Sequence, residues 1–276
     1  MLLLLSLACT AETDALVPTP ASAPVAVAEP VVVFTAKNGQ TITLDELDGD
    51  GTVDWKLIGG EDIPDQAVVE HNLGREAGAR GDYAVASAHF DKASALAPGW
   101  PYPYYDAGFS LLLKGDSTGA LVKYERALEL SPRGFFTAHV AVDSLRREAK
   151  GELPEGTYSA YVALEWVDNP IERNMLLGTM TSTVPQFAPG WHKFALLADD
   201  DTVMLERLDA GLEANPDPET LAMLLLNKAA LLDRIGRTDE AINILGELIV
   251  DPASSLSGEA LARKVLAQLV ATDPRP

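Results

Sequence analysis

A 34-residue internal repeat restricts the fold of this chain more than any other feature of its sequence. The segment that begins at Ala67 aligns with the segment that begins at Pro101. The residues matched at this constant offset are Gly74 and Gly108, Gly81 and Gly115, Asp82 and Asp116, Ala86 and Ala120, Phe90 and Tyr124, Ala93 and Ala127, and Pro98 and Pro132. Self-similarity of this kind predicts an array of stacked helical units, because one unit alone cannot bury its apolar face.

The residue types at the matched positions indicate how each unit is built. Glycine and alanine occur where two antiparallel helices cross closely, since larger side chains would separate them. Phe90 and Tyr124 would fill the space between one helix pair and the next, while Gly81-Asp82 turns the chain and Pro98 ends the second helix. This pattern resembles the tetratricopeptide repeat, with Glu70 and Tyr104 at the tryptophan position of the family. The resemblance implies an all-α, right-handed α-solenoid of helix pairs.

The repeats that follow are less regular. We expect helices over 135–150, 156–167, 170–184, 191–198 and 202–214, the last two joined by a short turn at 199–201. A third clear copy runs from Leu225 to Pro252, and residues 257–271 are predicted to form a capping helix. The solenoid with its cap would therefore occupy residues 64–276.

Charge and composition limit the classes of function. The chain has 276 residues, with 21 Lys and Arg against 41 Asp and Glu and a net charge of −20. An acidic surface repels phosphate backbones and anionic lipid headgroups, so nucleic-acid binding is not expected. The single cysteine, Cys9, excludes an internal disulfide and a cysteine-rich metal site.

The first thirty residues suggest an export signal and a tether. Met1 to Ala8 is apolar, and the small residue before Cys9 resembles the lipobox of bacterial lipoproteins, although no basic residue precedes it and Ser6 replaces the usual Leu. The resemblance assigns residues 1–9 to a signal with its lipobox and implies cleavage before Cys9 and lipidation of that cysteine. Residues 10–30 are rich in Ala and Pro and are predicted to form a semi-rigid spacer. An accidental cysteine after an apolar N-terminus is the alternative.

Residues 31–63 are predicted to form a small acidic β segment. Val31–Thr35 and Gln40–Leu44 have strand character and flank Asn38-Gly39, a dipeptide that favours a hairpin turn. A third strand is expected over 53–58, with Trp55 contacting the helices. Asp48, Asp50 and Asp54 partly resemble the start of an EF-hand loop, but Leu57 replaces its closing glutamate. We predict no metal site, and a calcium-responsive module is the alternative.

The tetratricopeptide resemblance also implies where a partner would bind. In that family the first helix of each pair lines a concave face that holds a peptide or protein. The side chains that this geometry assigns to the groove here are His71, Asn72, Arg75, Tyr102, Tyr105, Asp106, His139 and Arg146. Phe109 and Leu112 could equally belong to the core, because apolar residues at helical spacing usually do. The family's chaperone-binding carboxylate clamp is absent, since Asp106, Phe136 and Val140 stand at three of its positions.

Nothing in the sequence predicts catalysis. The chain has no P-loop, no G-x-S-x-G elbow and no H-E-x-x-H motif, and its four histidines show no metal-ligand spacing. We therefore predict a non-catalytic scaffold that needs no cofactor. It would bind a protein or peptide, and it would be lipid-anchored at the bacterial cell envelope. An enzyme whose site lacks a recognisable motif is the remaining alternative.

Overall fold

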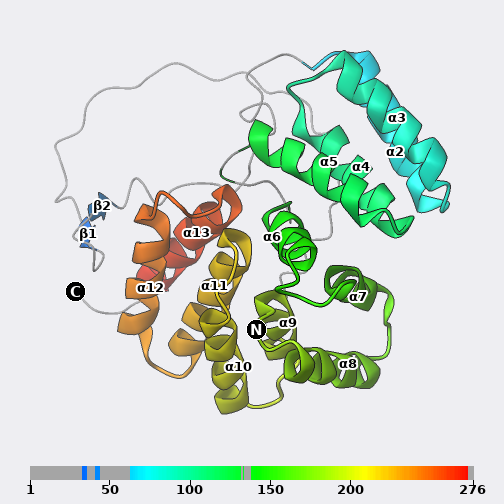
Figure 1. The fold of residues 1–276 in the computed structure, drawn as a ribbon. Helices are drawn as coiled ribbons and strands as arrows, with labels where there is room; N and C mark the ends of the chain where they lie inside the picture. The colour runs from blue at the N-terminus through cyan, green and yellow to red at the C-terminus, as the bar shows by residue number, and fades with distance from the viewer. Residues whose placement is uncertain (1–32, 36–40, 44–62, 132, 134–137, 273–276) are drawn as a thin grey trace, which may run out of the picture.

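A computed structural model describes residues 33–35, 41–43, 63–131, 133 and 138–272. Within these ranges the chain is almost entirely helical, so the predicted all-α solenoid is confirmed (Figure 1). The helices are α2 (Asp65–Ala79), α3 (Tyr83–Leu96), α4 (Pro101–Leu113), α5 (Ser117–Leu130), α6 (Ala138–Ala149), α7 (Thr157–Ala163), the 3-10 helix η2 (Leu164–Trp166), α8 (Pro170–Thr183), α9 (Ala188–Ala195), α10 (Asp201–Glu213), α11 (Pro218–Arg234), α12 (Thr238–Val250) and α13 (Leu256–Thr272). None of these helices has the length and apolarity needed to cross a membrane.

Two short strands lie before the helices. β1 (Val33–Thr35) pairs antiparallel with β2 (Thr41–Thr43), with Phe34 opposite Ile42, and both strands contact α12. The strand predicted over 53–58, the Asn38-Gly39 turn and the carboxylates of Asp48, Asp50 and Asp54 lie outside the described residues. So do Cys9 and the tether over 10–30.

The matched glycines and alanines bring the helices of each pair close together. A Cβ atom added to Gly74 would lie 2.5 Å from Cε1 of Phe90, and one added to Gly108 would lie 3.1 Å from the ring of Tyr124. The two contacts are the same contact one repeat apart, because glycine and ring are separated by 16 positions in each pair. The 34-residue alignment therefore describes a real packing repeat.

The first helix of a pair ends on a glycine with a left-handed backbone. Gly81, Gly115, Gly151 and Gly236 follow α2, α4, α6 and α11 with φ between 72° and 82°. In each case the next residue donates its N–H to the carbonyl five residues earlier, as Asp82 does to Ala77 at 2.9 Å. This bond satisfies one of the free carbonyls at the helix end and reverses the chain. The turn after α6 identifies α6 as a first helix, although its partner α7 is short.

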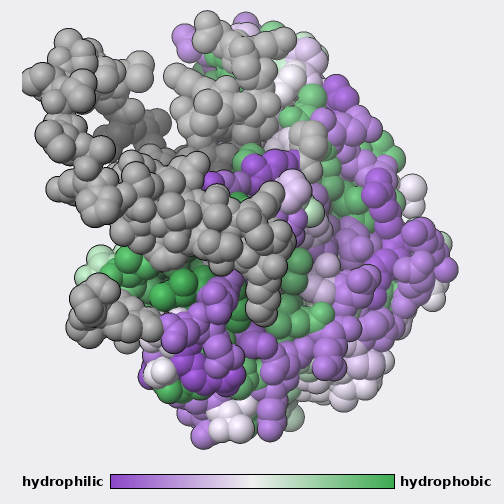
Figure 2. Space-filling view, turned by 90° about the vertical axis from the view of Figure 1, so that its left-hand side faces the viewer, coloured by the Kyte–Doolittle hydropathy of each residue, from purple (hydrophilic) through white to green (hydrophobic). Residues whose placement is uncertain are grey.

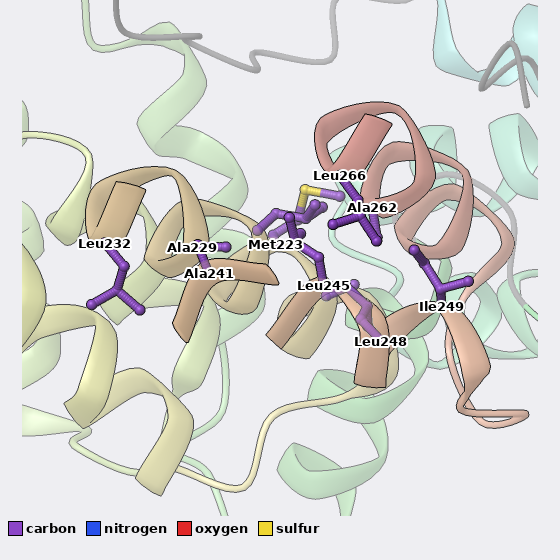
Figure 3. Packing of buried hydrophobic residues seen from close by; sticks show 11 residues of the cluster. Met223, Ala229, Leu232, Ala241, Leu245, Leu248, Ile249, Ala262 and Leu266 are labelled. Atoms are coloured by element: carbon purple, nitrogen blue, oxygen red, sulfur yellow. The ribbon is translucent and has the colours of Figure 1, made fainter. Parts of the chain in front are cut away.

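The predicted helices after residue 150 occur with small shifts of their bounds. The second helix expected over 156–167 is divided into α7 and η2, and α9 begins at Ala188 because Pro189 fits the first turn of a helix. The last three helices share an apolar core formed by Met223 and Ala229 of α11, Leu245 of α12 and Leu266 of α13, with their neighbours (Figure 3). The cap predicted over 257–271 is α13.

The C-terminal helices also contact a distant part of the chain. α11 packs against α6, and the backbone N–H of Leu256 donates to the carbonyl of Arg133 at 3.1 Å. The Arg133 guanidinium donates to the carbonyl of Ser254 at 3.2 Å and forms an ion pair with Glu259. The C-terminal helices therefore contact both Arg133 and α6, and Figure 1 shows α6, α11 and α13 close to one another.

Candidate interaction surfaces

Two of the predicted groove residues of α4, Asp106 and Tyr102, contact the buried histidine of α2. His71 of α2 is buried, and its Nε2 lies 2.8 Å from Oδ2 of Asp106 on α4. The His71 ring packs at 4.8 Å from the Trp100 ring and 6.3 Å from the Tyr102 ring, measured between centroids. The buried His71 side chain therefore supports Asp106 and Tyr102 from the interior, and Asp106 remains partly exposed.

The same arrangement occurs a second time, between α9 and α11. Nε2 of His192 lies 3.1 Å from Nδ2 of Asn227, and the two residues are 35 positions apart, as His71 and Asp106 are. Burial lowers the pKa of His192 to about 4, so this histidine is neutral at pH 7. A histidine that holds a polar side chain of the next first helix is thus a recurring structural feature of this solenoid.

Two of the predicted groove residues are exposed and unpaired on α2. Asn72 and Arg75 are one helical turn apart on the exposed side of that helix. Within the described part of the chain, neither side chain forms a hydrogen bond or an ion pair. The Arg75 guanidinium is therefore available to an external acceptor.

The other predicted groove residues have contacts within the molecule. Tyr105 is half-buried, and its ring lies 5.4 Å from that of Tyr124. Arg146 is exposed, but its Nε donates to Glu125 on the second helix α5 at 2.8 Å. His139 is half-buried, and burial lowers its pKa. These three side chains therefore differ from Asn72 and Arg75, because they are buried in part or engaged with other residues of the chain.

Part of α4 is covered by the segment that follows α6. Tyr158 and Val162 of α7 belong to one apolar cluster with Leu112 of α4, and Leu112 is buried there. The Trp166 ring of η2 lies 6.5 Å from the Phe109 ring. Phe109 and Leu112, for which the sequence left core and groove open, thus pack against the chain's own α7 and η2.

Two buried carboxyl groups at the start of α11 were not predicted. Asp217 accepts hydrogen bonds from the N–H groups of Glu219 and Thr220 and caps the helix. Burial raises the pKa of Asp217, and the nearby Asp143 carboxylate raises it further. Burial also raises the pKa of Glu219 to about 7. The Asp-Pro-Glu-Thr order could have predicted the cap, but no sequence signal indicates that Glu219 is buried.

The described residues contain no cluster of three or more His, Cys, Asp or Glu side chains that could hold a metal ion. Their exposed surface instead includes large apolar side chains near the start of α8, which the sequence patterns did not single out. The face of the molecule seen in Figure 2 is mainly hydrophilic, with apolar residues gathered in a few patches.

No protein-family model matches this chain, and no curated protein does. Among solved structures, the tetratricopeptide protein TTC0263 of Thermus thermophilus is 18% identical, with a TM-score of 0.33 and with 74% of this chain and 99% of that chain covered. MamA from Desulfovibrio magneticus RS-1, from residue 41 to its end, is 14% identical, with a TM-score of 0.33 and coverage of 78% and 100%. The TPR2AB domain of yeast Sti1, in a complex with pHSP90, is 13% identical, with a TM-score of 0.35 and coverage of 79% and 88%. At these TM-scores the whole chains do not superimpose closely, so the fold assignment rests on the helix pairs themselves.

Proposed function

We propose that this protein is a non-catalytic interaction module that binds a peptide or protein on the first-helix face of α2 and α4. The observation that carries the proposal is the exposed pair Asn72 and Arg75, which has no partner within the described residues. The next first helix, α4, carries Asp106 and Tyr102, which both contact the buried His71. Arginine and tyrosine on a rigid support are the side chains that contribute most binding energy at protein interfaces.

The binding chemistry follows from these side chains. The Arg75 guanidinium offers forked N–H donors that suit a carboxylate or a pair of backbone carbonyls. Asn72 can donate to and accept from a peptide backbone, and Tyr102 offers an apolar ring that loses little conformational entropy on binding. An extended or helical peptide segment would satisfy this combination.

We also propose that the module is tethered at the bacterial cell envelope through a lipid on Cys9. The support for this is in the sequence alone: the apolar segment before Cys9 and the Ala/Pro-rich residues 10–30. A spacer of this composition would hold the solenoid away from the bilayer surface.

Crosslinking capture from the native membrane fraction tests both parts of the proposal. The wild-type chain is compared with Arg75→Glu and with the control Arg80→Glu, which changes another exposed arginine at the end of α2. A partner that Arg75→Glu loses by about 10-fold and Arg80→Glu retains would support the groove. Equal capture by both variants, or no protein captured by the wild type, would contradict it. Cys9→Ala should leave the membrane fraction, and its retention there would contradict the lipid tether.

A further inference from the structure

The start of α8 carries an exposed apolar surface that the proposed groove does not explain. Ile171 is 73% exposed, Met175 is 68% exposed, and Trp166 in the preceding η2 is 58% exposed. Leu176 adds a fourth large apolar side chain next to Met175. We call Trp166, Ile171, Met175 and Leu176 the α8 surface. Ile171 and Met175 share one face of α8 because they are four positions apart, and exposed apolar patches mark interaction sites in soluble proteins.

The packing of α8 explains why this face is uncovered. Its buried side, with Leu177 and Thr181, faces α9, the only described element that α8 packs against closely. By contrast, α9 contacts α8, α10 and α11. In a helix-pair stack a helix is covered on more than one side, so the outward face of α8 is a position at which another helix could pack.

Two acidic side chains lie at the start of α8, close in sequence to the α8 surface. Asp168 precedes the helix and Glu172 lies on its first turn, and neither forms an ion pair within the described part of the chain. The nearest arginine along the chain, Arg173, donates to the neutral carbonyl of Val167 at 3.0 Å and keeps its positive charge. Two carboxylates against one guanidinium leave the start of α8 with a net negative charge.

The charge at the start of α8 identifies the kind of partner. Pairing with a second copy would bring Asp168 and Glu172 of both copies together, in a chain whose net charge is already −20. A partner with cations beside an apolar stripe would place opposite charges at the rim and apolar groups at the centre, which is the usual anatomy of a protein interface. We propose that the α8 surface binds a basic amphipathic helix of a partner protein.

The shape of the surface suits a helix. Ile171 and Met175 are four positions apart, so they form one ridge along α8, and such a ridge packs into the groove of a second helix. Methionine adapts its side chain to different partners, and a half-exposed tryptophan such as Trp166 provides an anchor. Its residues belong to η2 and α8, whereas Asn72 and Arg75 belong to α2, so it would be a second binding site of different chemistry.

Binding of a model peptide to the purified chain tests the proposal. The probe is a fluorescein-labelled peptide of Leu and Lys, about 18 residues long and so about five helical turns, with Leu on one face. A peptide with Glu in place of every Lys is its counterpart. Fluorescence anisotropy should detect binding of the Leu–Lys peptide and binding at least about 10-fold weaker of the Leu–Glu peptide. Failure of the Leu–Lys peptide to bind, or equal binding of both peptides, would overturn the proposal.

Variants then locate the site. Ile171→Glu/Met175→Glu should weaken binding of the Leu–Lys peptide by about 10-fold or more, whereas Val85→Glu/Val122→Glu, which alters two exposed valines on other helices, should not. Both pairs replace exposed residues, so unchanged circular dichroism is expected and is checked first.

A second pair of variants tests the charge. Asp168→Lys/Glu172→Lys should weaken binding of the Leu–Lys peptide, and Glu206→Lys/Glu213→Lys on α10, with the same change in net charge, should weaken it much less. Equal effects of the two pairs would mean that only net charge matters and would overturn the proposal. Wild-type dimers that dissociate in the Ile171→Glu/Met175→Glu variant would likewise overturn it in favour of a second copy. Arg75→Glu should leave this binding unchanged, so failure here and failure of the groove are distinguishable.

Discussion

Individual glycines set the distance between the helices of a pair. At Gly74 an added Cβ would enter the buried ring of Phe90, whereas at Gly78, four positions later on α2, it would lie 3.8 Å from the Cβ of Ala86, an ordinary contact. Phe90 of α3 is buried against α2 and against Ala107 of α4, so its ring cannot move without disturbing two helix pairs. The two glycines of one helix therefore serve different purposes, although both face α3.

Gly74→Ala and Gly78→Ala should consequently change stability in opposite directions. Gly74→Ala should lower the free energy of unfolding by about 1–3 kcal/mol, because overpacking forces the ring and the backbone to shift. Gly78→Ala should raise it by up to about 0.5–1 kcal/mol, since alanine restricts the unfolded chain and fits the native helix. Urea denaturation followed by circular dichroism measures both. Changes of the same sign in the two variants would show that lack of space beside Phe90 is not what requires glycine at position 74.

Among the elements, the contact between α11 and α13 contains a titratable group. The Glu219 carboxyl is buried at the start of α11, where Oε1 accepts a hydrogen bond from Ser257 of α13 at 2.9 Å. Its Oε2 is also buried and has no hydrogen-bond partner among the described residues. Burial and the nearby Asp217 raise the pKa of Glu219 to about 7, against 4.5 for an ordinary glutamate. Folding therefore favours the protonated form of this side chain.

The sign of the pH dependence follows from this shift. Between pH 4.5 and 7 the native state retains the proton that the unfolded state has lost, so this group lowers stability progressively as the pH rises through that interval. The full cost is about 3 kcal/mol at most. Glu219→Gln cannot ionise, and its melting temperature should equal that of the wild type near pH 5 and exceed it by about 5–10 °C at pH 8.

The exposed Glu206→Gln on α10 is the control for this titration and should show no such divergence. Differential scanning fluorimetry across the pH series provides the measurement. A Glu219→Gln advantage that is constant with pH would mean that removal of a strained contact, and not ionisation, is responsible.

Features that depend on contacts between residues close in sequence were easier to predict than features that depend on contacts between distant segments. Gly74, Gly108 and their aromatic partners are local features of a repeat, so a constant offset reveals both the helices and their packing. The turn glycines after α2, α4 and α11 were predictable for the same reason. The groove was less predictable, because residue position alone does not indicate that α7 and η2 pack against α4.

The exposed apolar residues of α8 illustrate a second limit. Ile171 and Met175 have the four-residue spacing of a core stripe, and such spacing normally predicts burial. Their exposure arises because α8 has one close neighbour among the described elements, a property of the whole arrangement. Likewise, the burial of Glu219 depends on α13, which is 37 residues or more away along the chain.

At the scale of the whole molecule, the chain is more than an open stack of repeats. Arg133 donates a hydrogen bond to Ser254 and forms an ion pair with Glu259, both more than 120 positions later, and α6 contacts α11. By contrast, among the described elements α2 packs closely only with α3 and α4, its neighbours in sequence. In Figure 1, α2 to α5 accordingly extend from a block formed by α6 and the helices after it. Local unfolding should therefore depend on different contacts in the two parts.

Arg133→Ala should release the C-terminal helix from this block without affecting the first repeats. The substitution removes hydrogen bonds from a charged, partly exposed side chain, for which about 1 kcal/mol is a reasonable loss. Amide hydrogen exchange within α13 should then accelerate by about fivefold, the equivalent of that energy, while exchange within α2 and α3 stays unchanged. Arg126→Ala, which breaks an exposed pair with Glu129 on α5, is the matched control and should alter neither region. Unchanged exchange in α13 would show that its packing on α11 and α12 alone holds it, whereas acceleration that spreads equally to α2 would show one cooperative unit in place of two parts.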